Sequence, residues 1–171
     1  MVLQQTSRME NIVNDLLSLS RIELQEHIRP NEKVNLNDII SHSIELHQEI
    51  LKKNNIECQF ERESKNVKIN GDRNRLIEVF NNLIDNGIKY SEKNKKITIT
   101  TKSENKNFLV TIKDQGIGIS KENIPQVTER FFRVDPAKSK EVGGTGLGLA
   151  IVKHIVNQHR AEMTISSEIN K

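Results

Sequence analysis

A glycine-rich segment, residues 143–149, has the composition of a phosphate-binding turn. Its glycines are Gly143, Gly144, Gly146 and Gly148, and apolar residues recur with a helical period from Leu147 to Val156. Without a Cβ, the backbone can approach a ligand closely. A glycine-rich turn that opens a helix also presents free N–H groups at the positive end of the helix dipole. The segment fits either a phosphate cradle or a mobile loop ahead of a core helix.

An asparagine cluster on a predicted helix could hold a metal ion. Asn82 and Asn86 are four residues apart, so both amides project from one helical face. Amide oxygens are suitable ligands for Mg²⁺, which completes its shell with water and phosphate oxygens. Lys89, on the next turn, could supply a positive charge to a phosphate. The alternative is a solvated polar face.

Two further clusters lie between residues 114 and 146, a stretch longer than a simple connection. Asp114 ends a predicted strand and is followed by Gly116 and Gly118, so it could accept a hydrogen bond from an amino group where the backbone turns sharply. The same pattern occurs in ordinary turns. Arg130 and Arg133 flank two phenylalanines and could neutralise phosphate charge. Stretches of this length are typical of lids or binding loops.

Periodicity predicts the elements that must position these clusters. Expected helices cover residues 6–26, a segment capped by Asn37 or Asp38 that runs to Lys53, a segment capped by Asp72 that ends near Tyr90, and the helix after the glycines. Expected strands cover residues 56–61, 67–69, 96–102, 107–113 and 162–167, and the third and fourth should form a hairpin. In the second helix Ile39, Ile40, Ile44, Leu46 and Ile50 should face inward.

The predicted first helix has a wide apolar face: Met9, Ile12, Val13, Leu16, Leu17 and either Leu19 or Ser20. This face must pack on something, and we expect the partner segment to lie outside this chain. The pattern breaks at Arg29–Pro30, where a linker begins.

Composition limits the function classes. The chain has 171 residues, no apolar run of membrane-spanning length and no visible secretory signal. Its net charge is +3 with dispersed lysines, no tryptophan and one tyrosine, so nucleic-acid binding is not expected. The single cysteine, Cys58, cannot form an internal disulfide and fits the role of a small buried hydrophobe.

The order and spacing of the four clusters resemble the ATP-binding catalytic domain of bacterial sensor histidine kinases, in the superfamily of gyrase, MutL and the heat-shock chaperone ATPases. Residues 82–90 look like the N box, residues 114–118 the G1 box, residues 129–133 the F box and residues 144–149 the G2 box. Residues 6–24 look like the second helix of the dimerisation and phosphotransfer hairpin. The whole is most similar to the phosphate-regulon sensor kinase branch.

The resemblance implies an α+β fold: a two-layer sandwich whose mixed sheet is covered on one face by helices, with a Bergerat-type ATP site. A single helix from the dimerisation hairpin would precede it. The implied organisation is residues 1–28 as part of that hairpin, 29–33 as a linker and 34–171 as the catalytic domain, truncated before its final strand.

It also implies how ATP is held. Asp114 would accept the adenine amino group, Thr145 would lie beside the base and Tyr90 would close over the nucleotide. The implied nucleotide-binding residues are Asn86, Lys89, Tyr90, Asp114, Gly116, Gly118, Thr145, Gly146, Leu147 and Gly148.

For catalysis, Asn86 would bind Mg²⁺, and Asn82 would be a second ligand or would position metal-bound water. Lys89 would contact the phosphates, and either Arg130 or Arg133 would approach the γ-phosphate. The implied catalytic residues are Asn82, Lys89, Arg130 and Arg133.

The sequence departs from the family pattern at several places. No His-Glu-x-x-x-Pro segment is present, and the histidines (His27, His42, His47, His154 and His159) have the character of ordinary surface or packing residues. The phosphoacceptor histidine must therefore lie outside this chain. Gly87 stands where the N box usually has alanine, Val127–Thr128 where Ile-Phe is commoner, and Arg160–Ala161 where two glycines usually turn the chain.

The expected function is transfer of the ATP γ-phosphoryl group to that histidine. Expected partners are the histidine-bearing helix of the same kinase, a response regulator and, in the full-length protein, a second subunit. We expect a soluble fragment from the cytoplasmic portion of a membrane-anchored sensor. The alternatives are an anti-sigma-type serine kinase, against which residues 6–26 argue, and a non-catalytic nucleotide-sensing module.

Overall fold

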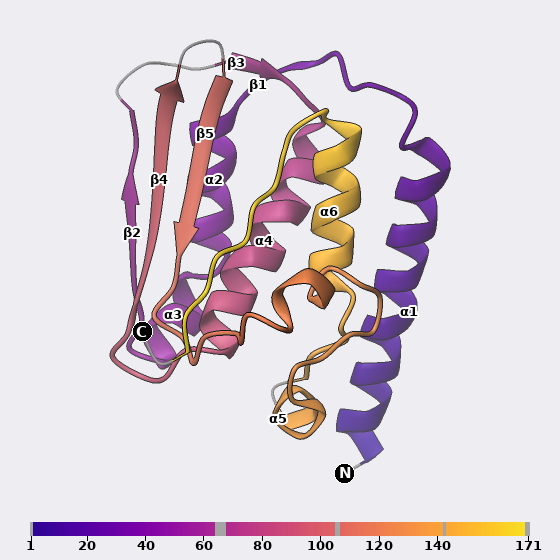
Figure 1. Cartoon of the computed structure of the whole chain (residues 1–171), viewed down its shortest axis with the longest axis vertical. Helices are drawn as coiled ribbons and strands as arrows, with labels where there is room; N and C mark the ends of the chain where they lie inside the picture. Colours follow the sequence, from indigo (N-terminus) through magenta and orange to yellow (C-terminus); the bar gives the residue numbers. More distant parts are fainter. Residues whose placement is uncertain (1, 64–67, 105–106, 142, 170–171) are drawn as a thin grey trace. The chain divides into compact units, whose positions relative to one another are not determined.

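A computed structural model describes residues 2–63, 68–104, 107–141 and 143–169 (Figure 1). Its contacts divide the chain into two compact units. Unit 1 comprises Met1–Arg29 and Ile119–Glu168, and unit 2 comprises Pro30–Gly118 and Ile169–Lys171. Within the described residues, no helix is both long and apolar enough to span a bilayer.

Unit 2 contains a mixed three-stranded sheet. Its strands are β2 (Glu57–Glu61), β4 (Lys96–Glu104) and β5 (Asn107–Lys113), in the order β2-β4-β5. β2 runs parallel to β4, and β4 pairs antiparallel with β5, with Ile99 opposite Ile112. This confirms the pairing of the predicted hairpin, although its turn at residues 105–106 lies outside the described residues. A further antiparallel pair joins β1 (Lys33–Asn35) to β3 (Lys68–Asn70). β1 was not predicted, and Val67 of the predicted strand at residues 67–69 lies outside the described residues.

Helices cover one face of this sheet. Along β4 the buried residues Ile97, Ile99 and Thr101 alternate with more exposed ones, as expected when a sheet has one covered face. Figure 1 shows α2 (Leu36–Leu46), α3 (Gln48–Lys53) and α4 (Arg73–Lys89) on that side. The core between the layers contains Val34, Leu36, Ile39, Ile40, Leu51, Ile56, Leu76, Phe80, Ile84, Ile88, Ile97 and Ile99. The predicted two-layer α+β fold is confirmed.

The helix that carries the asparagine cluster begins and ends where its sequence indicates. Asp72 caps α4, accepting hydrogen bonds from the backbone N–H groups of Asn74 at 2.9 Å and Arg75 at 3.1 Å. These bonds satisfy two of the donors that a helix N-terminus leaves unpaired. Tyr90 is the C-cap, and its N–H donates to the Asn86 carbonyl at 3.0 Å.

The second predicted helix is wrong in two details. Its N-cap is Asn35 rather than Asn37 or Asp38, and Asn37 is instead buried. The helix also breaks at His47, whose backbone is not helical, into α2 and α3. Two of the residues predicted to face inward, Leu46 and Ile50, are exposed, and Leu51 is buried instead.

In unit 1 the first helix packs against the helix that follows the glycine-rich segment. α1 (Val2–Gln25) packs along α6 (Gly148–Gln158), and the lid segment between residues 119 and 147 contains η1 (Ile124–Gln126) and α5 (Pro136–Glu141) (Figure 1). Leu19 and Ile22 of α1 are buried. Most of the predicted apolar face of α1 is exposed: Met9, Val13, Leu16 and Leu17.

The predicted strand at residues 162–167 is wrong. These residues are described and have no strand assignment, although their burial alternates, with Met163, Ile165 and Ser167 less exposed than their neighbours. Instead of a ladder bond, the Ser167 hydroxyl accepts a hydrogen bond from the Ile119 N–H at 2.9 Å. The alternation arises from one-sided packing, which a strand and an extended segment share.

Candidate functional site

The predicted metal ligands lie half-buried on α4. The side-chain nitrogen of Asn82 donates to the Glu78 carbonyl at 2.9 Å, so its amide oxygen is directed away from the helix backbone. Asn86 lies one turn further on. Lys89 forms an ion pair with Asp85, with Nζ 2.6 Å from Oδ2. A phosphate would compete with Asp85 for this lysine.

An open pocket of about 450 Å³ borders the cluster in unit 2. It is lined by His47, Asn74, Ile77, Glu78, Asn81, Asn82 and Asp85. The amide oxygen of Asn81 is buried and has no hydrogen-bond partner within the described residues. The described part of the chain also contains no group of three or more His, Cys, Asp or Glu side chains suited to a metal. A divalent ion here would therefore need amide oxygens, water and ligand phosphates, which is the donor set that Mg²⁺ accepts.

Asp114 is fixed at the end of β5 by its own turn. Its Oδ1 accepts a hydrogen bond from the Gly116 N–H at 2.8 Å. The following N–H, of Ile117, donates to the Tyr90 carbonyl at 3.1 Å and so joins this turn to the end of α4. Gly118 has a φ of +73°. The structure thus brings Tyr90, Asp114 and Gly116 together.

Gly87 explains how closely α4 approaches the sheet. A Cβ built at Gly87 would lie 2.9 Å from Cδ1 of Ile97 and 3.6 Å from Cβ of Asp114. The missing methyl group therefore allows the cluster helix to lie against β4 and beside Asp114. Glycine costs about 0.5–1 kcal/mol relative to alanine in a helix, and this close approach is what it allows.

The other predicted residues lie in unit 1, where hydrogen bonds join residues 131–133 to residues 145–146 at the base of the lid segment. The Phe131 N–H donates to the Gly146 carbonyl at 2.8 Å, and Nη2 of Arg133 donates to the Thr145 carbonyl at 2.9 Å. Gly146 has a φ of +76°, and a Cβ there would lie 3.0 Å from the Phe131 backbone. The two predicted motifs around residues 131 and 146 therefore form one connected structure, called the lid stem below.

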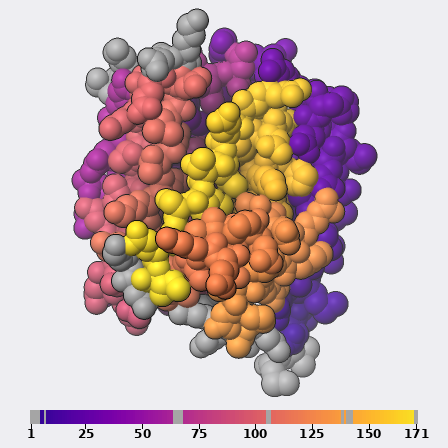
Figure 2. All heavy atoms as spheres, in the orientation of Figure 1, coloured from indigo at the N-terminus to yellow at the C-terminus, as the bar shows by residue number. Residues whose placement is uncertain are grey.

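Beyond the stem, the first turn of α6 has no side-chain cap among the described residues. Leu147 is its N-cap and is fully buried, but it supplies no side-chain hydrogen bond to the first turn. Gly148 is the first helical residue, so no side chain shields the N–H groups there. An anion is the natural partner for such a helix end. In Figure 2 the orange residues of the lid segment lie at the surface, and Phe131 and Val134 are about half exposed.

Two site residues in unit 1 contact α1, which was not predicted. The Thr145 hydroxyl donates to Oδ2 of Asp15 at 2.7 Å, and Arg130 forms an ion pair with Glu23. Leu19 lies between these two acids on the helix. Residues 15, 19, 22, 23 and 26 follow the spacing of one helical face, but the sequence does not indicate what the acids on that face contact.

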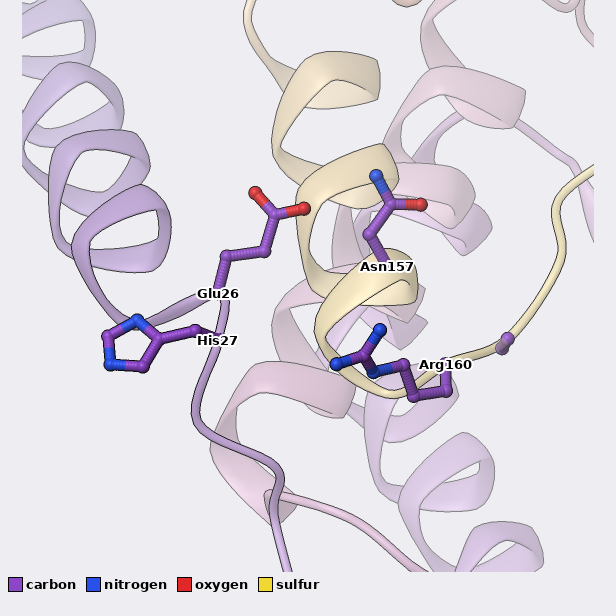
Figure 3. Close-up of a pocket in the computed structure, with 5 residues that line it drawn as sticks. Glu26, His27, Asn157 and Arg160 are labelled. Atoms are coloured by element: carbon purple, nitrogen blue, oxygen red, sulfur yellow. The ribbon is translucent and has the colours of Figure 1, made fainter.

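A second pocket, of about 540 Å³, lies in unit 1 and contains none of the predicted site residues. It is lined by Glu26, His27, Asn157, Arg160 and Ala161 (Figure 3). Arg160 has a φ of +54°, the left-handed conformation that follows many helix ends. Glycine adopts this conformation without the steric cost that a side chain adds.

The Cys58 thiol in unit 2 is a packing group. Its side chain is half-buried on β2, and desolvation by burial raises its pKa above the ordinary value of 9.0. A raised pKa keeps the group in the unreactive thiol form at neutral pH. The prediction of a small buried hydrophobe is consistent with this environment.

The fold and the site residues define an ATPase domain of a known kind. Residues 71–171 match the family described as "Histidine kinase-, DNA gyrase B-, and HSP90-like ATPase", and the chain belongs to this family. Its similar relatives are sensor histidine kinases. The chain is 34% identical over 164 residues to the phosphate regulon sensor protein PhoR of Pseudomonas aeruginosa, covering 96% of this chain and 37% of that protein.

Solved structures give the same result. Histidine kinase AdeS of Acinetobacter baumannii is 28% identical with a TM-score of 0.71, and the match covers 91% of this chain and 70% of that one. Histidine kinase ThkA in complex with response regulator protein TrrA is 26% identical with a TM-score of 0.71, covering 94% of this chain and 43% of that one. The chain spans about two fifths of the length of the curated relatives it matches.

Proposed function

We propose that this chain binds Mg·ATP and transfers the γ-phosphoryl group to a histidine that lies outside the chain. In this reaction an imidazole nitrogen bonds to the γ-phosphorus, the bond from that phosphorus to its bridging oxygen breaks, and ADP leaves. The observation that carries the proposal is the Asp114 turn. Among the described residues its carboxylate accepts one hydrogen bond, from the Gly116 N–H through Oδ1, which leaves Oδ2 for the adenine amino group.

The residues present also fit the metal. Asn86 would hold Mg²⁺, and the outward amide oxygen of Asn82 would be a second ligand or would position a metal-bound water. The ion supplies neutralisation of phosphate charge. Lys89 would exchange Asp85 for a phosphate oxygen, the N–H groups at Gly146–Gly148 would cradle the phosphates, and Arg130 or Arg133 would approach the γ-phosphate.

The remaining nucleotide contacts are proposals of the same kind. Thr145 would lie beside the base, Tyr90 would close over the nucleotide, and Gly116, Gly118 and Leu147 would contribute backbone contacts. We also retain the proposed division into a hairpin helix at residues 1–28, a linker at 29–33 and a catalytic domain from residue 34 onward.

The exposed apolar residues of α1 and a relative solved in complex with a response regulator support the proposed partners. Met9, Val13 and Leu17 are each more than half exposed, as expected for a helix that is completed by the histidine-bearing helix and a second subunit in a four-helix bundle. Because ThkA is known in complex with the response regulator TrrA, we propose a response regulator as the acceptor from the phosphohistidine. We also propose that the chain is the cytoplasmic part of a membrane-anchored sensor.

A labelling experiment tests the transfer. This chain is mixed with γ-labelled Mg·ATP and a full-length relative whose own nucleotide site has been inactivated. We expect label on the relative that is lost in acid and kept in base, as a phosphohistidine requires. Acid-stable label would indicate a serine kinase, and nucleotide binding without any transfer would indicate a sensing module.

A further inference from the structure

Two hydrogen bonds join the two sides of the lid stem. Phe131 and Gly146 are joined by a 2.8 Å backbone hydrogen bond, and Arg133 and Thr145 by a 2.9 Å bond. Because a Cβ at Gly146 would lie only 3.0 Å from the Phe131 backbone, the two sides of the stem are also in close contact. A contact that holds residue 130 or residue 145 therefore holds the whole stem.

Helix α1 holds the stem on both sides. Oδ2 of Asp15 accepts a hydrogen bond from the Thr145 hydroxyl at 2.7 Å on one side, and Glu23 pairs with Arg130 on the other. These acids are eight residues apart, or about 12 Å along the helix axis. We call Asp15 and Glu23 the acidic clasp.

Apolar packing and further polar contacts fix α1 in this position. Leu19 and Ile22, between the two acids, are buried. Nδ1 of His154 on α6 lies 2.8 Å from Oε2 of Glu26, and its Nε2 lies 3.2 Å from Oε1 of Glu23. Figure 3 shows the Glu26 side chain reaching from the end of α1 toward the last turns of α6.

The clasp uses groups that a nucleotide would need. The Thr145 hydroxyl has one proton, which goes to Asp15, and its oxygen accepts the Leu147 N–H at 3.3 Å. The Arg130 guanidinium faces a carboxylate, whose charge and planar pair of oxygens resemble those of a phosphate. A phosphate and Glu23 cannot both take the same donors of Arg130.

We propose that the acidic clasp is an internal competitor of the nucleotide: α1 occupies Thr145 and Arg130, and ATP binds most tightly when α1 releases them. The inference rests on the proposed function, because ATP is the ligand against which the clasp competes. Any signal that shifts α1 along or away from α6 then changes nucleotide affinity.

The test compares three variants with the wild type, all as the whole chain: Asp15→Ala, Glu23→Ala and the double variant. The matched control is Glu10→Ala, which removes an exposed carboxylate from the same helix. Two quantities are measured: amide hydrogen exchange at Phe131 and Leu147 without nucleotide, and the Kd of a non-hydrolysable ATP analogue with Mg²⁺. Circular dichroism checks that α1 remains helical.

In the double variant we expect faster amide exchange at the stem and a Kd lower by about tenfold. Each single variant should lower the Kd by about two- to fivefold, which corresponds to the free energy of one exposed ion pair. Glu10→Ala should change neither quantity. Unchanged exchange in the double variant would show that α1 does not hold the stem and would overturn the proposal. Faster exchange with an unchanged or higher Kd would overturn the competition. Faster exchange with no nucleotide binding by any form, wild type included, would instead refute the proposed function and the competition that rests on it.

Discussion

Gly116 leaves no room for a side chain beside Asp114. A Cβ at position 116 would lie 2.7 Å from Oδ1 of Asp114 and 2.8 Å from the carbonyl oxygen of Tyr90. The turn that fixes the carboxylate is therefore also the turn that joins β5 to the end of α4. If Asp114 recognises adenine, its precision depends on this glycine.

Gly116→Ala should weaken nucleotide binding more than it weakens the fold. The methyl group must displace either the carboxylate or the Tyr90 backbone, so we expect the Kd of an ATP analogue to rise by about tenfold or more, about 1.4 kcal/mol. The preference for adenine over guanine should fall as well, because guanine offers an acceptor where adenine has its amino group. Titration with both analogues, alongside thermal melting, measures this. An unchanged Kd and preference would show that Asp114 is not the base-recognition residue.

Gly87→Ala should gain less stability than helix propensity alone predicts. The substitution is favourable in an unhindered helix by about 0.5–1 kcal/mol. Here the new Cβ meets Cδ1 of the buried Ile97 at 2.9 Å. Ile97→Val removes that methyl group, so Gly87→Ala should be more favourable in the Ile97→Val background. Denaturant unfolding of the four proteins gives the coupling, and simple additivity would contradict this account of the close approach.

Thr101→Val should cost about 1–3 kcal/mol, the range for leaving a buried polar group without its partner. The Thr101 hydroxyl donates to Oδ1 of the buried Asn37 at 3.2 Å and accepts the Glu63 N–H at 3.1 Å. It thereby ties α2 and the segment after β2 to β4. Thr111→Val, at an exposed position of β5, is the matched control and should change the free energy of unfolding by less than about 0.5 kcal/mol. Equal effects of the two substitutions would mean that the buried network contributes nothing.

Cys58 should make stability fall at high pH. Burial raises the thiol pKa in the folded state above its ordinary value of 9.0, so the folded protein holds this proton more tightly than the unfolded chain. The contribution is complete below the unfolded pKa and is lost as pH rises through the folded pKa. Under reducing conditions, the wild type should therefore lose more unfolding free energy between pH 8 and pH 10.5 than Cys58→Val does. Parallel losses would contradict the raised pKa.

Much of unit 2 could be predicted because its local signals agree with its packing. Asp72 caps α4 as its position before the apolar run indicates, and β4 and β5 alternate as strands with one covered face. The break at His47 could not be predicted, because the residues around it are compatible with a continuous helix. Residues 162–167 alternate in burial like a strand, and only a pairing partner, which is a tertiary feature, separates the two cases.

At the candidate site, too, the sequence indicates residues but not their tertiary contacts. Motif spacing identified the residues around Asp114 and Gly146 but not what they touch. The sequence marks Gly87 only as a departure from the family pattern, whereas the 2.9 Å between a built Cβ and Cδ1 of Ile97 shows why glycine suits this position. The contacts of Asp15 and Glu23 could not be predicted, because nothing in the sequence of a helix says which distant loop will supply Thr145 and Arg130.

The central claim is Mg²⁺-dependent ATP binding through the asparagine cluster. Calorimetry with a non-hydrolysable ATP analogue, with and without Mg²⁺, tests it on the wild type and on Asn86→Ala, with Asn54→Ala as an asparagine control on another helix end. We predict that Mg²⁺ tightens binding to the wild type and to the control by at least about tenfold, and that Asn86→Ala removes this gain. Absence of binding to the wild type, or an undiminished Mg²⁺ effect in Asn86→Ala, would contradict the account.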